Sequence, residues 1–205
     1  MIQLERADGI WTITLDRPDK ANALTPQMLE QLCTIVEDAA EARVLVLTGT
    51  GRVFSAGADL DAAKAGLATS DLWERLSGAI ARHPGLTICA LNGTVAGGAM
   101  GMVLACDLRL SVPGAKMFYP VMKLGFLPQP SDPVRLAAIA GASRAKMILM
   151  GGAKIMVEEA LTWGLIDRIC DDPVTEAHSL STDTLAASPA HARAIKSMIG
   201  PAATI

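Results

Sequence analysis

The sequence has few aromatic residues and no run of basic residues. Its 205 residues include three Phe, three Trp and one Tyr, and the formal net charge is −3 at pH 7. Proteins that bind nucleic acids rely on basic surfaces, and those that bind single strands also stack bases on aromatic side chains. We therefore expect no nucleic-acid partner.

Cysteine motifs are absent as well. The four cysteines are Cys33, Cys89, Cys106 and Cys170, and no two of them form a Cys-x-x-Cys pair. The spacing that is typical of zinc sites and dithiol redox centres is therefore missing. All four lie in apolar stretches, which favours buried thiols in a reducing compartment. We expect no metal site and a cytoplasmic location.

One long segment, Leu86–Cys106, lacks charge altogether. It is long enough in principle to cross a bilayer. However, the turn dipeptide Asn92-Gly93 and the pair Gly97-Gly98 interrupt it. We therefore predict a buried strand, a turn and a buried helix rather than a membrane span. The first residues, 1–9, carry early charges and lack the apolar core of a secretory signal.

Hydrophobic residues make up 51% of the chain, so a sizeable core is expected. Short apolar runs closed by turn residues alternate with helical patterns, which predicts an α/β fold with parallel strand pairing. Thr25 followed by Pro26 predicts a helix start. The expected strands lie at 10–16, 43–49 and 86–93, and the expected helices at 26–41 and 70–83. After residue 128 the pattern is mostly helical, with one short strand at 165–170.

Two glycine-containing loops each follow a predicted strand and lead into a helix. They are FSAGADL, Phe54–Leu60, and NGTVAGG, Asn92–Gly98. Such turns expose backbone N–H groups, and small residues let a ligand approach them closely. Two facing turns can donate two hydrogen bonds to one oxygen, which is an oxyanion hole suited to a carbonyl that becomes an enolate. The alternative is that both are tight turns under close packing.

Two further motifs are incomplete. GTGRVF, Gly49–Phe54, begins like a dinucleotide fingerprint but lacks its third glycine and a following helix. VFSAG resembles a nucleophile elbow around Ser55, but valine stands at position 53 where that motif needs glycine.

With these residues in view, the chain resembles the crotonase, or enoyl-CoA hydratase/isomerase, family. FSAGADL and NGTVAGGAMGMVLACDLRL resemble the two oxyanion-hole motifs of the family, in order and each after a strand. LDRPDKANALT, KLGFLPQPSDPVRLAAIAG and EEALTWGLIDRI resemble three further family segments. The resemblance covers nearly the whole chain.

The resemblance implies an α/β fold, a crotonase-like spiral of ββα units, here with a shortened C-terminal helical region. We expect a core over 1–170 and a short helical segment over 171–205. The family binds acyl-CoA thioesters and assembles as a trimer or a dimer of trimers, so a homo-oligomer is expected. The backbone N–H groups of Ala58 and Gly98 are the implied oxyanion donors. The implied coenzyme A pocket contains Ala23, Leu24, Ala56, Asp59 and Leu60.

The sequence departs from the family where a hydratase carries its two glutamates. Gly101 and Val121 occupy these positions. Hydration needs one group to activate water and another to handle the α-proton, so simple hydration is not expected. Asp132 lies near where some members carry a carboxylate and is a candidate acid/base. It is also typical of a helix N-cap, because Pro133 follows it.

The sequence therefore predicts an acyl-CoA-binding member of this family in fatty acid metabolism, with lyase- or isomerase-type enolate chemistry. Coenzyme A would enter as part of the substrate, with no separate cofactor. A non-catalytic acyl-CoA-binding protein is the alternative reading. A nucleotide-dependent oxidoreductase, favoured only by Gly49–Phe54, is a third.

Overall fold

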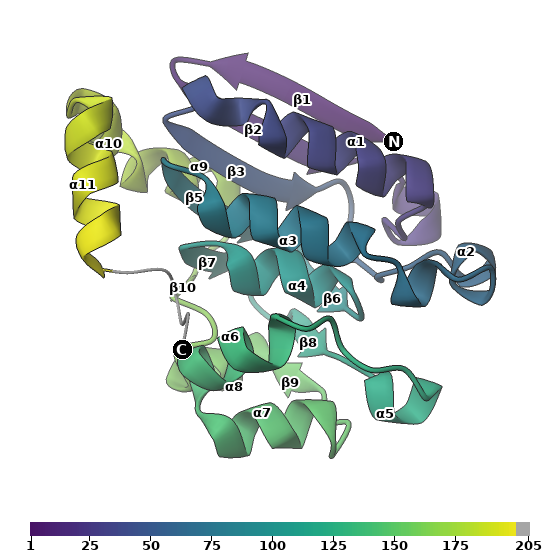
Figure 1. Ribbon diagram of the computed structural model, residues 1–205. Helices are drawn as coiled ribbons and strands as arrows, with labels where there is room; N and C mark the ends of the chain where they lie inside the picture. The colour runs from purple at the N-terminus through teal and green to yellow at the C-terminus, as the bar shows by residue number, and fades with distance from the viewer. Residues whose placement is uncertain (200–205) are drawn as a thin grey trace.

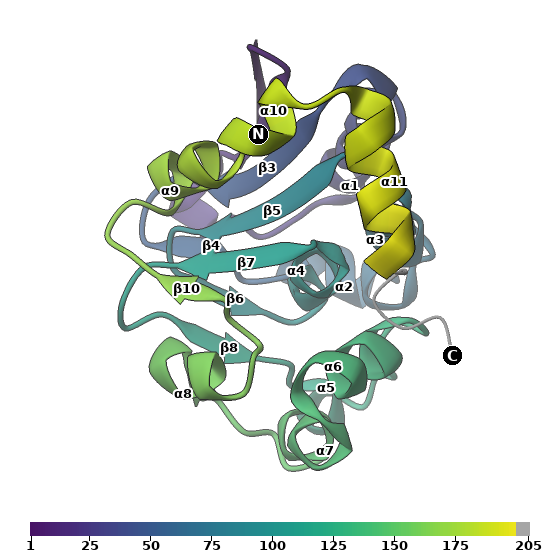
Figure 2. The ribbon, with the colours of Figure 1, turned by 90° about the vertical axis from the view of Figure 1, so that its left-hand side faces the viewer.

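The computed structural model describes residues 1–199. Two sheets form its centre, and helices cover them on both sides (Figures 1 and 2). The larger sheet has the strand order β1-β2-β3-β5-β7-β10, and all its pairs are parallel except β1 with β2. Its strands are β1 (Ile2–Ala7), β2 (Ile10–Leu15), β3 (Val44–Gly49), β5 (Leu86–Leu91), β7 (Leu108–Ser111) and β10 (Arg168–Ile169).

The smaller sheet has the order β4-β6-β8-β9. Its strands are β4 (Val53–Ser55), β6 (Thr94–Ala96), β8 (Lys116–Phe118) and β9 (Ile155–Met156). The chain passes from the larger sheet to the smaller sheet three times: from β3 to β4, from β5 to β6, and from β7 to β8. A helix follows each pair, so the chain winds through successive ββα units. This confirms the spiral implied by the resemblance and the expected parallel pairing.

The helices of residues 1–199 follow the sequence pattern closely. Thr25 Oγ1 accepts a hydrogen bond from Met28 N, 3.3 Å away, and Pro26 opens the first helix as expected. The helices are α1 (Pro26–Glu37), α2 (Leu60–Lys64), α3 (Leu72–Arg82), α4 (Ala99–Ala105), α5 (Val121–Leu124), α6 (Asp132–Ala140), α7 (Ala142–Leu149), α8 (Val157–Thr162), α9 (Pro173–Leu180), α10 (Thr182–Ala186) and α11 (Pro189–Ile199). Short 3₁₀ turns lie at Pro18–Lys20, Ala39–Glu41 and Leu67–Thr69.

The uncharged segment 86–106 forms β5, β6 and α4 rather than a membrane span. Every residue of α4 is buried, which explains its lack of polar side chains. Within residues 1–199, no helix is both long and apolar enough to cross a bilayer. The strand, turn and helix predicted there are confirmed, with β6 as an additional short strand.

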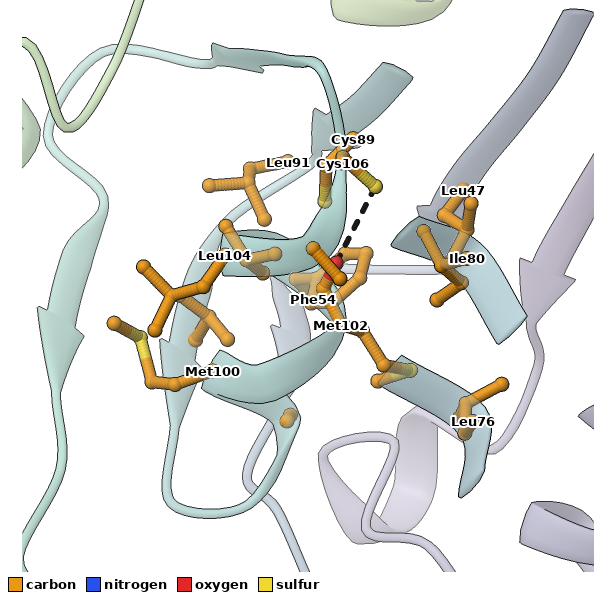
Figure 3. Close-up of a cluster of buried hydrophobic side chains, with 14 of the residues drawn as sticks. Leu47, Phe54, Leu76, Ile80, Cys89, Leu91, Met100, Met102, Leu104 and Cys106 are labelled. Carbon is orange, nitrogen blue, oxygen red and sulfur yellow. Dashed lines mark hydrogen bonds between the residues drawn. The ribbon is translucent and has the colours of Figure 1, made fainter. Parts of the chain in front are cut away.

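The larger sheet is buried on both faces. Successive residues of a strand point to opposite sides, so Val44 and Val46 face α9 whereas Leu45 and Leu47 face α1 and α3. Figure 2 shows α9 and α10 on the side of β3 and β5 opposite to α1. Figure 3 shows side chains of β3, β4, α3, β5 and α4 meeting in one cluster. Because α4 is locked into this core, the loop before it has a fixed position.

The C-terminal segment expected over 171–205 contains α9 to α11, and its residues 200–205 lie outside the described residues. The proposed boundary at residue 170 stays a prediction.

Candidate functional site

The two glycine-containing loops lie side by side. The first loop begins within β4 and the second contains β6, and these strands pair in parallel with Val53 opposite Thr94, so both loops leave the same edge of the smaller sheet. At Gly57 the φ angle is +90°, and a Cβ would lie 2.8 Å from Ala96 O and 3.3 Å from Gly97 Cα. Only glycine fits there, because a side chain would force the loops apart.

Each loop presents one predicted oxyanion donor. Leu24 N donates to Gly57 O and Asp59 N donates to Leu24 O, both at 2.8 Å, so these two bonds fix the backbone on either side of Ala58. Gly98 is the last residue before α4. In the part of the chain that the structure describes, neither the Ala58 N–H nor the Gly98 N–H donates to a protein acceptor. Both groups are therefore free to bind an oxygen of a ligand.

Asn22 holds the first loop in place, a role that the sequence analysis missed. Its Nδ2 donates to Val53 O at 2.7 Å and to Thr50 O at 3.0 Å. Ser55 Oγ donates to Asn22 O at 2.9 Å and accepts from Gly57 N at 3.1 Å. Asn22 is fully buried, with φ at +52°, a conformation that asparagine adopts more readily than most residues. Ser55 is thus a structural anchor in this arrangement.

Asp132 lies against Gly101, the position at which the resemblance implies a hydratase glutamate. Its side chain is fully buried, and a Cβ built on Gly101 would lie 2.9 Å from Asp132 Oδ1 and 3.2 Å from Oδ2. A side chain at position 101 would therefore meet the carboxylate of Asp132, and one of the two would have to shift. The aspartate on α6 fills the space that the glycine on α4 leaves open.

Asp132 does not cap its helix, so the N-cap interpretation is wrong. The helix α6 begins at Asp132 itself, and Ser131 precedes it. The carboxylate bonds instead to a side chain outside the helix: Tyr119 OH donates to Oδ2 at 2.9 Å. Among residues 1–199, Oδ1 has no hydrogen-bond partner. A buried, unpaired carboxylate oxygen is costly, so Asp132 is a candidate functional side chain.

Burial raises the pKa of Asp132 to about 7. The Tyr119 hydrogen bond and the charge of Arg135 act in the opposite direction, whereas Glu74 raises the pKa slightly further. Burial and the neighbouring Asp132 raise the pKa of Tyr119, so its hydroxyl stays protonated near neutral pH. A carboxyl group with a pKa near 7 can both take and return a proton at that pH.

Two contacts with α3 fix the start of α6. The Glu74 carboxylate accepts hydrogen bonds from the N–H of Ser131, at 3.2 Å, and from its hydroxyl. Arg135 Nη1 donates to Ser77 Oγ at 2.9 Å. Both oxygens of Glu74 are thus engaged by Ser131, whereas Asp132 Oδ1 has no partner among residues 1–199.

The surroundings of Val121 and Gly98 account for the apolar residue at the first position and the glycine at the second. Val121 is buried at the first turn of α5 and offers no acid or base. A Cβ on Gly98 would lie 3.0 Å from the Trp73 ring, which is held by a bond from Nε1 to Leu67 O at 2.8 Å. Gly98 therefore has no room for a side chain beside its N–H.

Three of the predicted coenzyme A residues belong to the first loop and two, Ala23 and Leu24, lie outside it, and the five differ in exposure. Ala23 and Leu24 are buried, whereas Ala56 and Leu60 are exposed. Asp59 accepts from Arg17 Nη1 at 2.8 Å and caps α2, and the Arg17 hydrogen bond lowers its pKa. Their role in binding coenzyme A stays a prediction.

The segment Gly49–Phe54 does not form a dinucleotide site. It is a tight turn between β3 and β4, with no helix starting after it. The fingerprint needs a helix N-terminus to receive the phosphates, so the oxidoreductase alternative has no structural support.

Comparison with known proteins agrees with this geometry. The family model described as enoyl-CoA hydratase/isomerase matches residues 5–204. The "Probable enoyl-CoA hydratase echA6" of Mycobacterium leprae (strain TN) is 35% identical over 175 residues, which cover 82% of this chain and 71% of that protein. The 1,2-epoxyphenylacetyl-CoA isomerase of Escherichia coli (strain K12) is 32% identical over 176 residues, which cover 80% and 67%.

Solved structures share the fold. DspI of Pseudomonas aeruginosa gives a TM-score of 0.88 at 28% identity, over 97% of this chain and 85% of that chain. An enoyl-CoA hydratase of Bacillus anthracis gives 0.87 at 28% identity, over 97% and 81%.

Proposed function

Because this chain belongs to the enoyl-CoA hydratase/isomerase family, we propose that it is an enoyl-CoA isomerase. In this proposal it binds an acyl-CoA thioester and moves a proton along the acyl chain, and it does not add water. The observation that carries the proposal is the buried Asp132, whose unpaired Oδ1 lies where position 101 would otherwise hold a glutamate.

The thioester carbonyl oxygen would accept hydrogen bonds from Ala58 N–H and Gly98 N–H. These donors are fixed before the reaction starts, since the Leu24 bridge and the buried α4 hold them. Preorganised donors of this kind stabilise the negative charge that develops on an enolate oxygen, and each is worth on the order of 3 kcal/mol. The acidity of the carbon next to the carbonyl rises accordingly.

Asp132 would then act as a single acid/base. Its ionised Oδ1 takes a proton from C2 of a 3-enoyl thioester, and the electron pair of that C–H bond delocalises into a dienolate. The dienolate collapses by taking the same proton from Asp132 at C4, which moves the double bond to C2–C3. No atom is gained or lost, so one carboxyl group suffices.

Hydration has a different requirement. It needs a base for the incoming water and an acid for the α-carbon, and Val121 offers neither function. Glu74 is held by Ser131. One relative of this chain is named a 1,2-epoxyphenylacetyl-CoA isomerase, so isomerisation of a coenzyme A thioester is among the activities named for its relatives.

The remaining parts of the proposal concern binding and assembly. Coenzyme A would lie along Ala23, Leu24, Ala56, Asp59 and Leu60, as part of the substrate and with no further cofactor. Exposed apolar side chains on and after α5, such as Met122 and Leu127, support a homo-oligomer, a trimer or a dimer of trimers. A cytoplasmic role in fatty acid metabolism would fit this substrate.

The test is a kinetic comparison on a 3-enoyl-CoA, with the rise of the conjugated 2-enoyl thioester absorbance as the readout. We expect turnover by the unmodified protein and a loss of about 100- to 10,000-fold in kcat for Asp132→Asn. Asp183→Asn removes an exposed carboxylate on α10 and is the matched control.

Binding is measured on the same proteins by calorimetry. Binding without any turnover would overturn the isomerase proposal in favour of a non-catalytic acyl-CoA-binding protein. Full activity of Asp132→Asn would show that another group transfers the proton.

A further inference from the structure

The two oxygens of Asp132 lie in different surroundings. Oδ2 accepts the Tyr119 hydroxyl at 2.9 Å, whereas Oδ1 faces the backbone of Gly101 with no partner among the described residues. The carboxylate is fully buried, so solvent does not compete for either oxygen. The pairing with Tyr119 therefore selects which oxygen is available.

The position of Tyr119 is tied to the second glycine-containing loop. Its neighbour Phe118 ends β8 and accepts a hydrogen bond from Gly97 N at 3.1 Å. Tyr119 O accepts from Val121 N at 2.9 Å, which fixes the start of α5. The phenol is 4% exposed. The same strand end thus holds the loop that carries Gly98 and the hydroxyl that binds Asp132.

We propose that Tyr119 is a positioning residue for the proton transfer: its hydroxyl holds Oδ2 of Asp132 and leaves Oδ1 as the oxygen that exchanges the proton with the substrate. This inference rests on the proposed isomerase function. It adds a residue that contacts Asp132 rather than the substrate, and it predicts how the pH dependence of the reaction is set.

Three groups on separate elements act on the charge of Asp132. Tyr119, between β8 and α5, and Arg135, on α6, both favour the ionised carboxylate, and Glu74, on α3, disfavours it. Tyr119→Phe keeps the ring and removes only the hydroxyl. The loss of a hydrogen bond to a charged group should move the titration of Asp132 upward by about one to two pH units.

The experiment is the pH profile of isomerisation for the unmodified protein and Tyr119→Phe. We expect the midpoint of kcat to rise by about one to two pH units in the variant, because the base form of Asp132 becomes scarcer. At pH values below both midpoints, kcat should fall about 10- to 100-fold, and the deficit should shrink as the pH rises. An equal deficit at every pH would overturn the inference, since a packing defect alone gives that result.

Thr87→Val is the matched control, because Thr87 Oγ1 also donates to an aspartate, Asp107 Oδ2, at 2.9 Å. This variant should keep the midpoint of the unmodified protein. A second readout needs no turnover: the ¹³C resonance of the Asp132 carboxyl carbon, assigned by its absence in Asp132→Asn, reports the titration directly. A midpoint that is the same in Tyr119→Phe and the unmodified protein would overturn the inference. A shifted midpoint of the Asp132 titration in a protein that converts no 3-enoyl-CoA would overturn the isomerase function. It would still support the hydrogen bond from Tyr119 to Oδ2 as the contact that sets the titration.

Discussion

Adding a methyl group at Gly101 should destabilise the protein only while a side chain of the size of aspartate stands at position 132. A Cβ at Gly101 would lie 2.9 Å from Asp132 Oδ1 and 3.4 Å from its Cγ. The hydrogen bond from Tyr119 to Oδ2 opposes a shift of the carboxylate. Overpacking of this kind typically costs about 1–3 kcal/mol. We expect Gly101→Ala to lower the free energy of unfolding by about that amount.

The effect of Gly101→Ala on the free energy of unfolding should change sign once the carboxylate is removed. In an Asp132→Ala background the clash is gone, and alanine is favoured over glycine in a helix by about 1 kcal/mol. Gly101→Ala should then be neutral or stabilising, so the two sites should be coupled by about 2 kcal/mol or more. Urea denaturation of the four proteins measures this coupling. Asp132→Asn keeps the volume and should keep the clash, which separates size from charge.

The same cost for Gly101→Ala in both backgrounds would refute the packing of Asp132 against α4. It would also remove the structural support for Asp132 as the proposed acid/base. A neutral effect in the unmodified protein would have the same consequence.

Three further outcomes are expected. Asn22→Ala should lower the free energy of unfolding by about 2–4 kcal/mol in urea titrations, because it leaves the carbonyls of the loop around Val53 unpaired, and it should weaken acyl-CoA binding in calorimetry. Lys196→Met should speed hydrogen exchange in α11, which has no buried residue and is tied down by bonds from Lys196 Nζ to Asp107 Oδ2 and Gly85 O. Relative to Asp132→Asn, the free energy of unfolding of the unmodified protein should fall as the pH rises from about 4 to about 7, and should then stay level. The reason is that the native Asp132 keeps a proton that the unfolded chain, with a pKa of 3.8, has already released. Denaturation at a series of pH values should show a loss of at most about 4 kcal/mol.

The sequence was sufficient for the main elements of the fold. Alternating apolar runs and a Thr-Pro start predicted β2, β3, β5 and α1 within a few residues. The antiparallel strand β1 was missed although its signal is present. Asp8-Gly9 forms the turn between β1 and β2, with φ angles of +50° and +83°, and Asp-Gly between alternating residues is a strong hairpin signal.

The strands of the smaller sheet were harder to predict. They span two or three residues each, which is too short for an alternating pattern to stand out. Their pairing depends on how the ββα units stack, and that is a tertiary property. The spiral followed from the resemblance alone.

The candidate site was predicted in part. The two loops followed from glycine placement, since small residues mark a close approach of backbone, whereas the donors Ala58 and Gly98 were implied by the resemblance and stay a prediction. The contacts of Asp132 were harder to predict, because Asp-Pro at a helix start is typical of an N-cap. Its pairing with Tyr119 and its contact with Gly101 join residues from separate elements. Such contacts have no local sequence signal.

The most direct test of the central claim is hydrogen exchange at the carbon next to the thioester carbonyl. A saturated acyl-CoA is incubated with the protein in deuterated water and analysed by mass spectrometry. We expect deuterium to enter C2 with the unmodified protein and with Asp183→Asn, and to be lost with Asp132→Asn, while a 2-enoyl-CoA gains no water. Exchange that persists in Asp132→Asn, or ready hydration of the 2-enoyl-CoA, would contradict the assignment of Asp132 as the single acid/base.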